Sequence, residues 1–275
     1  LPNENIAFDW IQQLPDNLEG DYYLLVNIEP VSPAGPDDTF PMDFTPTITI
    51  RSKNKTQVLH ITEENNFPTE RPSTSDDGRY VVYEQMDGSG IQQIHFRDLV
   101  LGTPAVRVSE RTINGNIFGG NGHSLRPEIS GDGQIIVFHS FASNLVPDDK
   151  NDHSDVFLYR VLNGQLVRAI NSITGEEGNG PSYYPTLNHD GSLVTFHSKA
   201  NNIHVNVDWL AKPIHQQIYL WDTTIGTFGE ITVVTKGNNE SRHPFISGTG
   251  NVIVFESDAS DIVPDPNGDG IDNNA

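Results

Sequence analysis

The chain has 275 residues, 35% of them hydrophobic, and a formal net charge of −21. A surface this acidic repels phosphates and anionic lipid, so we expect neither nucleic acid nor an anionic membrane surface as a partner. The sequence contains no cysteine, which excludes disulfides and thiolate metal sites. It also lacks an apolar run of the roughly 20 residues that a membrane-spanning helix needs, so no membrane insertion is predicted.

The N-terminal segment, residues 1–66, contains short strand-like runs separated by a Pro- and Asp-rich loop. Alternating and β-branched residues predict strands at Asn5–Trp10, Tyr22–Ile28, Thr47–Ile50 and Gln57–Ile61. The first residue, Leu1, is not an initiator methionine. We therefore expect the sequence to be a mature form or a piece of a longer polypeptide.

Two features of this segment resemble the end of a CARDB-type adhesion module. One is the run Leu-Pro-x-Asn-Leu-x-Gly-Asp-Tyr-Tyr-Leu-Leu-Val at 14–26, and the other is Glu-Glu-Asn-Asn at 63–66. The resemblance implies part of an immunoglobulin-like β-sandwich. The alternative is that these strands form a degenerate first blade of the repeat described next, or complete its last blade.

Residues 67–275 contain an internal repeat with the pattern Pro, a Gly-containing turn, and an apolar run that ends in an aromatic residue. Its prolines are Pro72, Pro127, Pro185 and Pro244, which are 55, 58 and 59 positions apart. Repetition at this period is typical of β-propellers and other repeat architectures.

Each repeat predicts four antiparallel strands. The stretch around the proline forms the innermost strand, with the proline at its start, and the apolar run forms a second strand buried on both faces between neighbouring blades. Third strands are predicted at Ile91–Asp98, Asp155–Tyr159 and Gln217–Asp222, and fourth strands at Ala105–Ser109, Leu166–Ile170 and Glu230–Thr235. Four strands per repeat predict an all-β protein, a β-propeller of four-stranded blades.

The second repeat, Arg126–Ile170, resembles the propeller repeat of TolB-like proteins. The shared elements are the Ser/Asp-Gly turn, the strand ending in Phe-x-Ser, the Ala-Ser-x-aliphatic-Val-Pro element at Ala142–Pro147 and Ala259–Pro264, and the strand Asp-Val-Phe-Leu-Tyr. The resemblance covers residues from about 70 to 275 and implies a β-propeller. Repeats one and three depart from it, with a shortened loop at Met86–Gly90 and a longer, different one at Ala200–Pro213.

The fourth repeat is shorter than the others, because the sequence ends where its third strand would begin. We expect its open edge to be completed by the N-terminal strands, by a neighbouring chain, or by sequence beyond this piece. Strand donation between chains predicts self-association through the unpaired edge of the last blade, as in a filament or matrix.

The pattern Asp-x-Asn-x-Asp-Gly near the C-terminus predicts a calcium site. Its oxygen ligands would come from Asp265, Asn267, Asp269, the carbonyl of Ile271, and Asp272. The pattern resembles thrombospondin type-3 or dockerin loops, and the sequence is too short for the glutamate of an EF-hand. The alternative is a solvated Asn/Asp/Gly turn.

A related loop in the second repeat offers Asp149, Asn151 and Asp155 as ligands of a second metal ion. Lys150 stands where the strict alignment places a ligand, and its charge opposes a cation. The alternative is a turn in which Asp155 caps the chain.

The sequence singles out no catalytic residues. His139 and His197 occupy equivalent positions of two repeats, which indicates a structural role, and no Gly-x-Ser-x-Gly motif is present. Trp209, Trp221, Tyr183 and Tyr184 are candidates for stacking on sugar rings, although Trp221 ends a strand and favours packing. The Gly/Asn-rich stretch at 114–122 predicts a flexible loop between blades.

The sequence favours an exported, non-enzymatic scaffold, stabilised by calcium, that binds a protein or glycan at the propeller face. We expect it to be secreted, at the cell surface or in the periplasm. One alternative is the self-assembling filament. The other is a propeller glycoside hydrolase or lyase, or the non-catalytic propeller of a peptidase.

Overall fold

The computed structural model describes three N-terminal strands and most of the chain after residue 67. The described residues are 23–30, 44–51, 56–60, 68–170, 174–203, 215–225 and 229–262. All the regular elements among them are β-strands, so the predicted all-β class is confirmed. In these ranges there is no helix of the length and apolarity that crossing a membrane requires.

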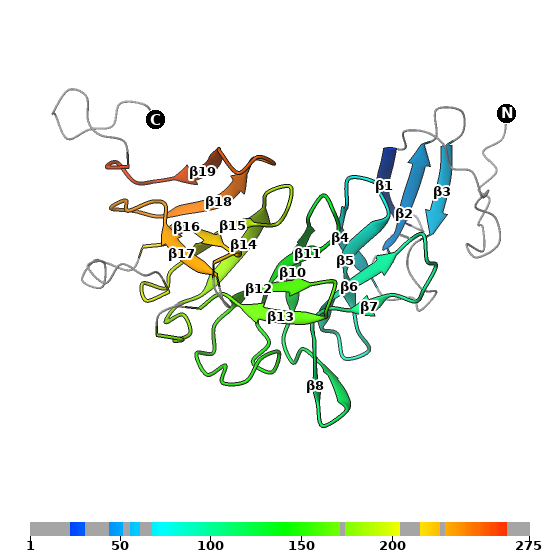
Figure 1. Ribbon diagram of the computed structural model, residues 1–275, viewed down its shortest axis with the longest axis horizontal. Helices are drawn as coiled ribbons and strands as arrows, with labels where there is room; N and C mark the ends of the chain where they lie inside the picture. Colours follow the sequence, from blue (N-terminus) through cyan, green and yellow to red (C-terminus); the bar gives the residue numbers. More distant parts are fainter. Residues whose placement is uncertain are drawn as a thin grey trace, which may run out of the picture.

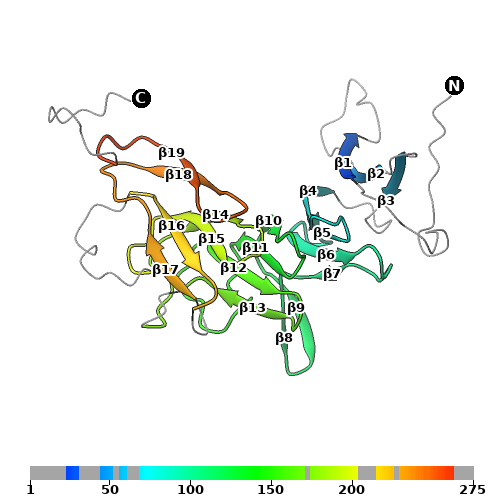
Figure 2. The ribbon, with the colours of Figure 1, turned by 45° about the horizontal axis from the view of Figure 1, so that its top comes forward.

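Four antiparallel sheets follow one another in chain order along an arc (Figures 1 and 2). The first contains β4 (Thr69–Thr74), β5 (Tyr80–Met86), β6 (Gln92–Asp98) and β7 (Val106–Arg107). The second contains β10 (Ser124–Ile129), β11 (Ile135–Ser140), β12 (Asp155–Arg160) and β13 (Gln165–Arg168). The third contains β14 (Ser182–Leu187), β15 (Leu193–Ser198), β16 (Gln217–Asp222) and β17 (Glu230–Val233), and the fourth β18 (Ser241–Ile246) and β19 (Ile253–Ser257).

These sheets are the predicted blades of a β-propeller. In the first three, strands pair in the order of the sequence, innermost to outermost, and the predicted third and fourth strands are confirmed. One prediction is wrong in detail: the prolines do not start the inner strands. Each lies inside its strand, at a register shift where the missing N–H costs no ladder hydrogen bond.

The N-terminal strands form a separate three-stranded meander of β1 (Tyr23–Pro30), β2 (Phe44–Arg51) and β3 (Thr56–His60). Three of the four predicted strands are therefore confirmed, and Asn5–Trp10 lies outside the described residues. The division of the chain into residues 1–66 and 67–275 stays a prediction.

The stretch predicted as a flexible loop at 114–122 is instead partly a hairpin, of β8 (Glu110–Ile113) and β9 (Asn116–Gly119). Its turn is Asn114–Gly115, both with positive φ, as a two-residue Asn-Gly hairpin requires. The hairpin extends away from the blades in both views (Figures 1 and 2).

The second strand of the middle blade packs on both of its neighbours. Ile136 and Phe138 of β11 join a core with the first blade, whereas Ile135 and Val137 join a core with the third. The alternation of side chains along a strand sends successive residues to opposite faces. A run that is apolar at every position is therefore the expected sequence of a strand between two blades.

The Ala-Ser-Asn element of the second repeat and its counterpart in the third join their blades to the loops that precede them. Asn144 accepts the N–H of Asn121 at 2.9 Å and donates to the carbonyl of Gly119 at 2.9 Å. The same bond recurs between Asn202 and Asn179 at 2.9 Å, so the third repeat keeps this element despite its different loop. This motif, which resembles an element of TolB-like repeats, therefore has a structural role: its asparagine links two loops by hydrogen bonds.

The outer face of the last described sheet is exposed. Val254 of β19 is 56% exposed, whereas Val137 at the equivalent position of β11 is fully buried. No described strand packs on that face of β19. Among the described residues, the four sheets therefore form three interfaces, and the fourth sheet is covered on one side only.

Candidate functional site

The four inner strands share a backbone irregularity at the residue before each proline. Arg71, Arg126, Tyr184 and His243 have positive φ angles of 49°, 54°, 54° and 50°. Positive φ is uncommon for residues other than glycine, and a following proline normally holds a residue in the extended region. The conformation is therefore a costly one, repeated at one place in every repeat.

A side chain of the preceding blade accepts the N–H group that this bulge turns out of the ladder. Glu84 Oε1 accepts the N–H of Arg126 at 2.6 Å, and His197 Nδ1 accepts the N–H of His243 at 3.1 Å. Both acceptors stand at the same position of the second strand, as does His139. The predicted structural role of His197 follows directly from this bond, while His139 Nδ1 is buried with no hydrogen-bond partner.

Tyr184 is the centre of an aromatic cluster formed by inner and second strands. Its ring lies against His139, His197 and His243, with centroids 5.9, 5.1 and 4.8 Å away. The guanidinium carbon of Arg126 lies 3.8 Å from the centroid of the same ring, within cation–π distance.

The hairpin turns at the other end of the inner strands are joined by backbone hydrogen bonds from blade to blade. Asp76 N–H donates to Gly131 O at 2.9 Å, Gly131 N–H to His189 O at 2.7 Å, and His189 N–H to Gly248 O at 2.9 Å. The side chains of His189 and Asp76 meet at 2.6 Å across Gly131. A Cβ at Gly131 would lie 2.7 Å from His189 Nε2 and 2.9 Å from Asp76 Oδ2, so a larger residue there would displace this pair of side chains.

The inner strands line an open cavity of about 740 Å³, which we call the central cavity. Its walls carry three rings of equivalent residues: the four before the prolines, the four after them, and the turn residues. The four after the prolines are Ser73, Glu128, Thr186 and Phe245. The volume lies in the range of small-ligand sites.

Glu128 is the buried carboxyl of the cavity wall. Burial raises its pKa to about 7, against the opposing hydrogen bond from the N–H of Leu187. At neutral pH this group therefore holds a proton about half of the time, and it adds less than a full negative charge to the wall.

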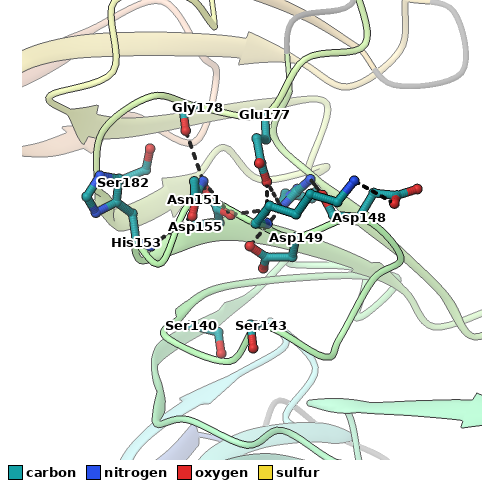
Figure 3. Close-up of polar contacts among 12 residues, drawn as sticks. Ser140, Ser143, Asp148, Asp149, Asn151, His153, Asp155, Glu177, Gly178 and Ser182 are labelled. Atoms are coloured by element: carbon teal, nitrogen blue, oxygen red, sulfur yellow. Dashed lines mark hydrogen bonds and ion pairs between the residues drawn. The ribbon is translucent and has the colours of Figure 1, made fainter.

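The metal ligands predicted in the second repeat do come together, around an arginine (Figure 3). Arg168 Nη1 lies 3.2 Å from Asp149, 3.2 Å from Asp155 and 3.0 Å from Glu177. Asn151 donates to Asp155 and to the carbonyl of Gly178. The cation that these carboxylates face is thus a guanidinium.

The Arg168 cluster is almost completely buried from solvent. The side chains of Arg168, Asp149 and Asp155 are 8%, 3% and 2% exposed. Burial raises the pKa of Asp155 to about 7 and also raises that of Asp149, although Arg168 opposes both shifts. One guanidinium cannot fully offset the desolvation of several carboxylates. The ion pairs of Arg168 also link the loop at 148–155 to Glu177, which precedes the next blade.

The remaining residues that the sequence predicts as metal ligands or as stacking residues have the following positions. The predicted calcium ligands Asp265, Asn267, Asp269, Ile271 and Asp272, together with Trp209, lie outside the described residues. Trp221 is 1% exposed and belongs to the core, as predicted. Within the described ranges, no group of three or more His, Asp or Glu side chains is arranged to hold a metal ion.

Comparison with known proteins gives the fold. No family model matches the chain, and no curated protein does. The structure is similar to TolB from Acinetobacter baumannii, with 19% identity over 78% of this chain and 44% of that protein, at a TM-score of 0.46. It is also similar to a putative TolB from Agrobacterium tumefaciens, with 16% identity over 85% of this chain and 71% of that one, at a TM-score of 0.48.

A third similar structure is the tricorn protease, with 11% identity over 74% of this chain and 20% of that one, at a TM-score of 0.47. The chain thus spans less than half of the Acinetobacter protein and a fifth of the tricorn protease. None of these comparisons supports the resemblance of residues 1–66 to a CARDB-type module.

Replacement of Arg168 tests the buried cluster. Arg168→Met leaves buried carboxylates without their cation and is expected to lower the free energy of unfolding by about 3–5 kcal/mol at pH 8. The loss should shrink at pH 5, where the raised pKa values allow the carboxyls to take up protons. Arg160→Met, which removes one hydrogen bond to the carbonyl of Thr223, is the matched control and should cost less than about 1 kcal/mol. Equal effects in urea unfolding would contradict this assignment.

The pKa of Glu128 predicts a pH-dependent stability. Because burial raises it from an ordinary value of 4.5 to about 7, the folded chain binds more protons than the unfolded chain between these values. Stability therefore falls as pH rises from about 5 to 8, by about 1–3 kcal/mol. Glu128→Gln should remove this part of the dependence and be the more stable protein at pH 8. Parallel pH profiles for the two proteins would show that the carboxyl is not desolvated.

Proposed function

We propose that this chain is a binding module that holds a protein or glycan ligand in its central cavity. The observation that carries the proposal is the ring of four residues before the prolines, each with positive φ, around one cavity. Residues in sparsely populated backbone conformations cost about 1–3 kcal/mol each and cluster at ligand-binding and active sites. Here four of them converge on the same space.

The chemistry of the wall favours binding over catalysis. The cavity offers an aromatic platform at Tyr184, guanidinium groups at Arg71 and Arg126, and a single buried carboxyl, Glu128. Glycoside hydrolysis uses two carboxyl groups that flank the scissile bond. The other carboxylate of the wall, Asp76, is held by His189.

A propeller glycoside hydrolase or lyase is the second candidate function. Glu128 favours it, because a carboxyl with a pKa of about 7 is suited to general acid–base catalysis at neutral pH. The non-catalytic propeller of a peptidase is a variant of the first proposal, since its ligand would also be a peptide.

The setting that we propose is outside the cytoplasm: secreted, at the cell surface or in the periplasm. It rests on the acidic composition and the TolB-like repeats. Self-association through the edge of the last blade, as in a filament, also remains a proposal. The exposed face of β19, with Val252 and Val254 each 56% exposed, is the feature that favours it.

Replacement of Tyr184 tests the binding proposal. A displayed library of short peptides and a glycan array provide the first ligands, and affinity for the best of them is then measured by calorimetry. Tyr184→Ala should weaken binding at least about tenfold, because it removes the central aromatic ring of the cavity wall, on which the Arg126 guanidinium lies. Phe118→Ala, an exposed aromatic on the β8–β9 hairpin, should have no effect.

Three results would count against this function. They are a loss of affinity only in Phe118→Ala, turnover of a bound glycan, and ligands whose affinity is the same for both variants and the parent. Far-ultraviolet circular dichroism and the melting temperature show whether Tyr184→Ala remains folded.

We also propose that calcium binds at Asp265–Asp272, on the strength of the sequence pattern. An ion that binds only the folded chain raises its stability by mass action, by about 2.7 kcal/mol when free calcium is 100 times its dissociation constant. Millimolar calcium should therefore raise the melting temperature, and Asp269→Asn should abolish the rise. Asp152→Asn, in the exposed loop of the second repeat, should keep it. A melting temperature that is insensitive to calcium would remove the proposal.

A further inference from the structure

The lining of the central cavity is less acidic than the protein as a whole, because Asp76 and Glu128 are matched there by two arginines. The chain has a net charge of −21, yet two of the four residues before the prolines are Arg71 and Arg126. Arg71 pairs with Glu84 at 3.4 Å. Within the described residues, the guanidinium of Arg126 has no carboxylate at salt-bridge distance and lies on the ring of Tyr184 instead.

The backbone explains why the guanidinium of Arg126 forms no salt bridge with a described residue. Glu84 is the nearby carboxylate, but it accepts the backbone N–H of Arg126 at 2.6 Å and pairs with the side chain of Arg71. Its side chain is 1% exposed, so it is committed to these two partners. The guanidinium of Arg126 is thereby held over Tyr184 with its planar N–H donors on the cavity wall.

The remaining groups of the wall do not compensate Arg126. Glu128, two residues further along β10, has a pKa raised to about 7 by burial. His243, on the far side of Tyr184, lies 3.1 Å from Glu256, and Asp76 lies 2.6 Å from His189 at the turn end. Among the described residues, an anionic ligand would therefore meet a guanidinium that forms no salt bridge, with Glu84 as its nearby buried carboxyl.

Much of the wall is apolar. Besides the four prolines, Ile129, Leu187, Phe245 and Ile246 line the cavity. A ligand that fits both features has a carboxylate beside an apolar side chain, as an acidic peptide or the C-terminus of a chain does. An acidic sugar is polar over most of its surface and would leave these side chains against hydroxyl groups.

We propose that the central cavity recognises a carboxylate of a peptide ligand, with Arg126 as the residue that binds it and Tyr184 as the support of the guanidinium. Guanidinium groups bind carboxylates through two parallel hydrogen bonds, and stacking on an aromatic ring fixes the plane of the guanidinium N–H donors. The prolines and Phe245 contact the apolar side chain that lies beside the carboxylate of the ligand. This inference rests on the proposed binding function and names its ligand class.

The test compares two small probes that differ only in charge, N-acetylphenylalanine and N-acetylphenylalaninamide. Binding is followed by NMR through the arginine Nε–Hε resonances, of which that of Arg126 should shift on titration of the acid. The acid should bind at least about tenfold more tightly than the amide, because a hydrogen bond to a charged group contributes about 1.5–3 kcal/mol. Arg126→Gln should abolish this preference, and Arg111→Gln, on the β8–β9 hairpin, should retain it.

The remaining outcomes separate this inference from the binding function. Equal binding of acid and amide, or binding of neutral cellobiose at Tyr184, would overturn the carboxylate claim and leave the cavity as a binding site. Inorganic phosphate that displaces the acid and binds more tightly would also overturn it, in favour of another anion. If none of the probes shifts any resonance of the cavity wall, while array ligands bind independently of Tyr184, both claims fail.

Discussion

The structure depends on the hydrogen bonds that join the inner strands of successive blades. At the turn end, the backbone bonds from Asp76 to Gly131, from Gly131 to His189 and from His189 to Gly248 form one continuous series. At the other end, the bulges before Pro127 and Pro244 turn the N–H groups of Arg126 and His243 toward the preceding blade, where Glu84 and His197 accept them. Sheets packed only through apolar faces are free to slide, whereas these directional bonds fix the spacing of the inner strands and hence the size of the cavity.

The same bulges connect architecture to function. Proline has no N–H to donate, so it suits a break in the ladder, and the residue before it takes an unfavourable φ that points its side chain toward the cavity. The side chains at these positions are therefore free to vary in chemistry while the backbone stays the same. Here they are two arginines, a tyrosine and a histidine, and they place guanidinium groups beside aromatic rings in an acidic protein.

The sequence predicts the blades well because each rests on local signals: the turn glycines, the period of the prolines, and runs that are apolar on both faces. Of the site, it singles out only Tyr184, as a candidate for stacking on sugar rings, and not Arg126 or Glu128. Arg126 and Tyr184 are 58 positions apart, and only the closure of neighbouring blades brings them together. The equivalence of the residues before the prolines is a usable signal, since those positions differ in type inside an otherwise regular repeat.

The Arg168 cluster shows the reverse case. Asp149 and Asp155 do converge as the sequence predicts, but the cation that they face comes from Arg168 on another strand. The β8–β9 hairpin was missed although its Asn-Gly turn is a strong local signal.

Amide hydrogen exchange is the most direct test of this account, because it reads the bonds between inner strands one by one. We expect the amides of Gly131, His189 and Arg126 to exchange as slowly as those of the core strand β11, and Glu84→Ala to accelerate the exchange of Arg126 before that of Gly131. Rapid exchange of all three amides in the intact protein, at the rate of the exposed β8–β9 turn, would mean that the blades are not fastened at the inner strands and would contradict the account.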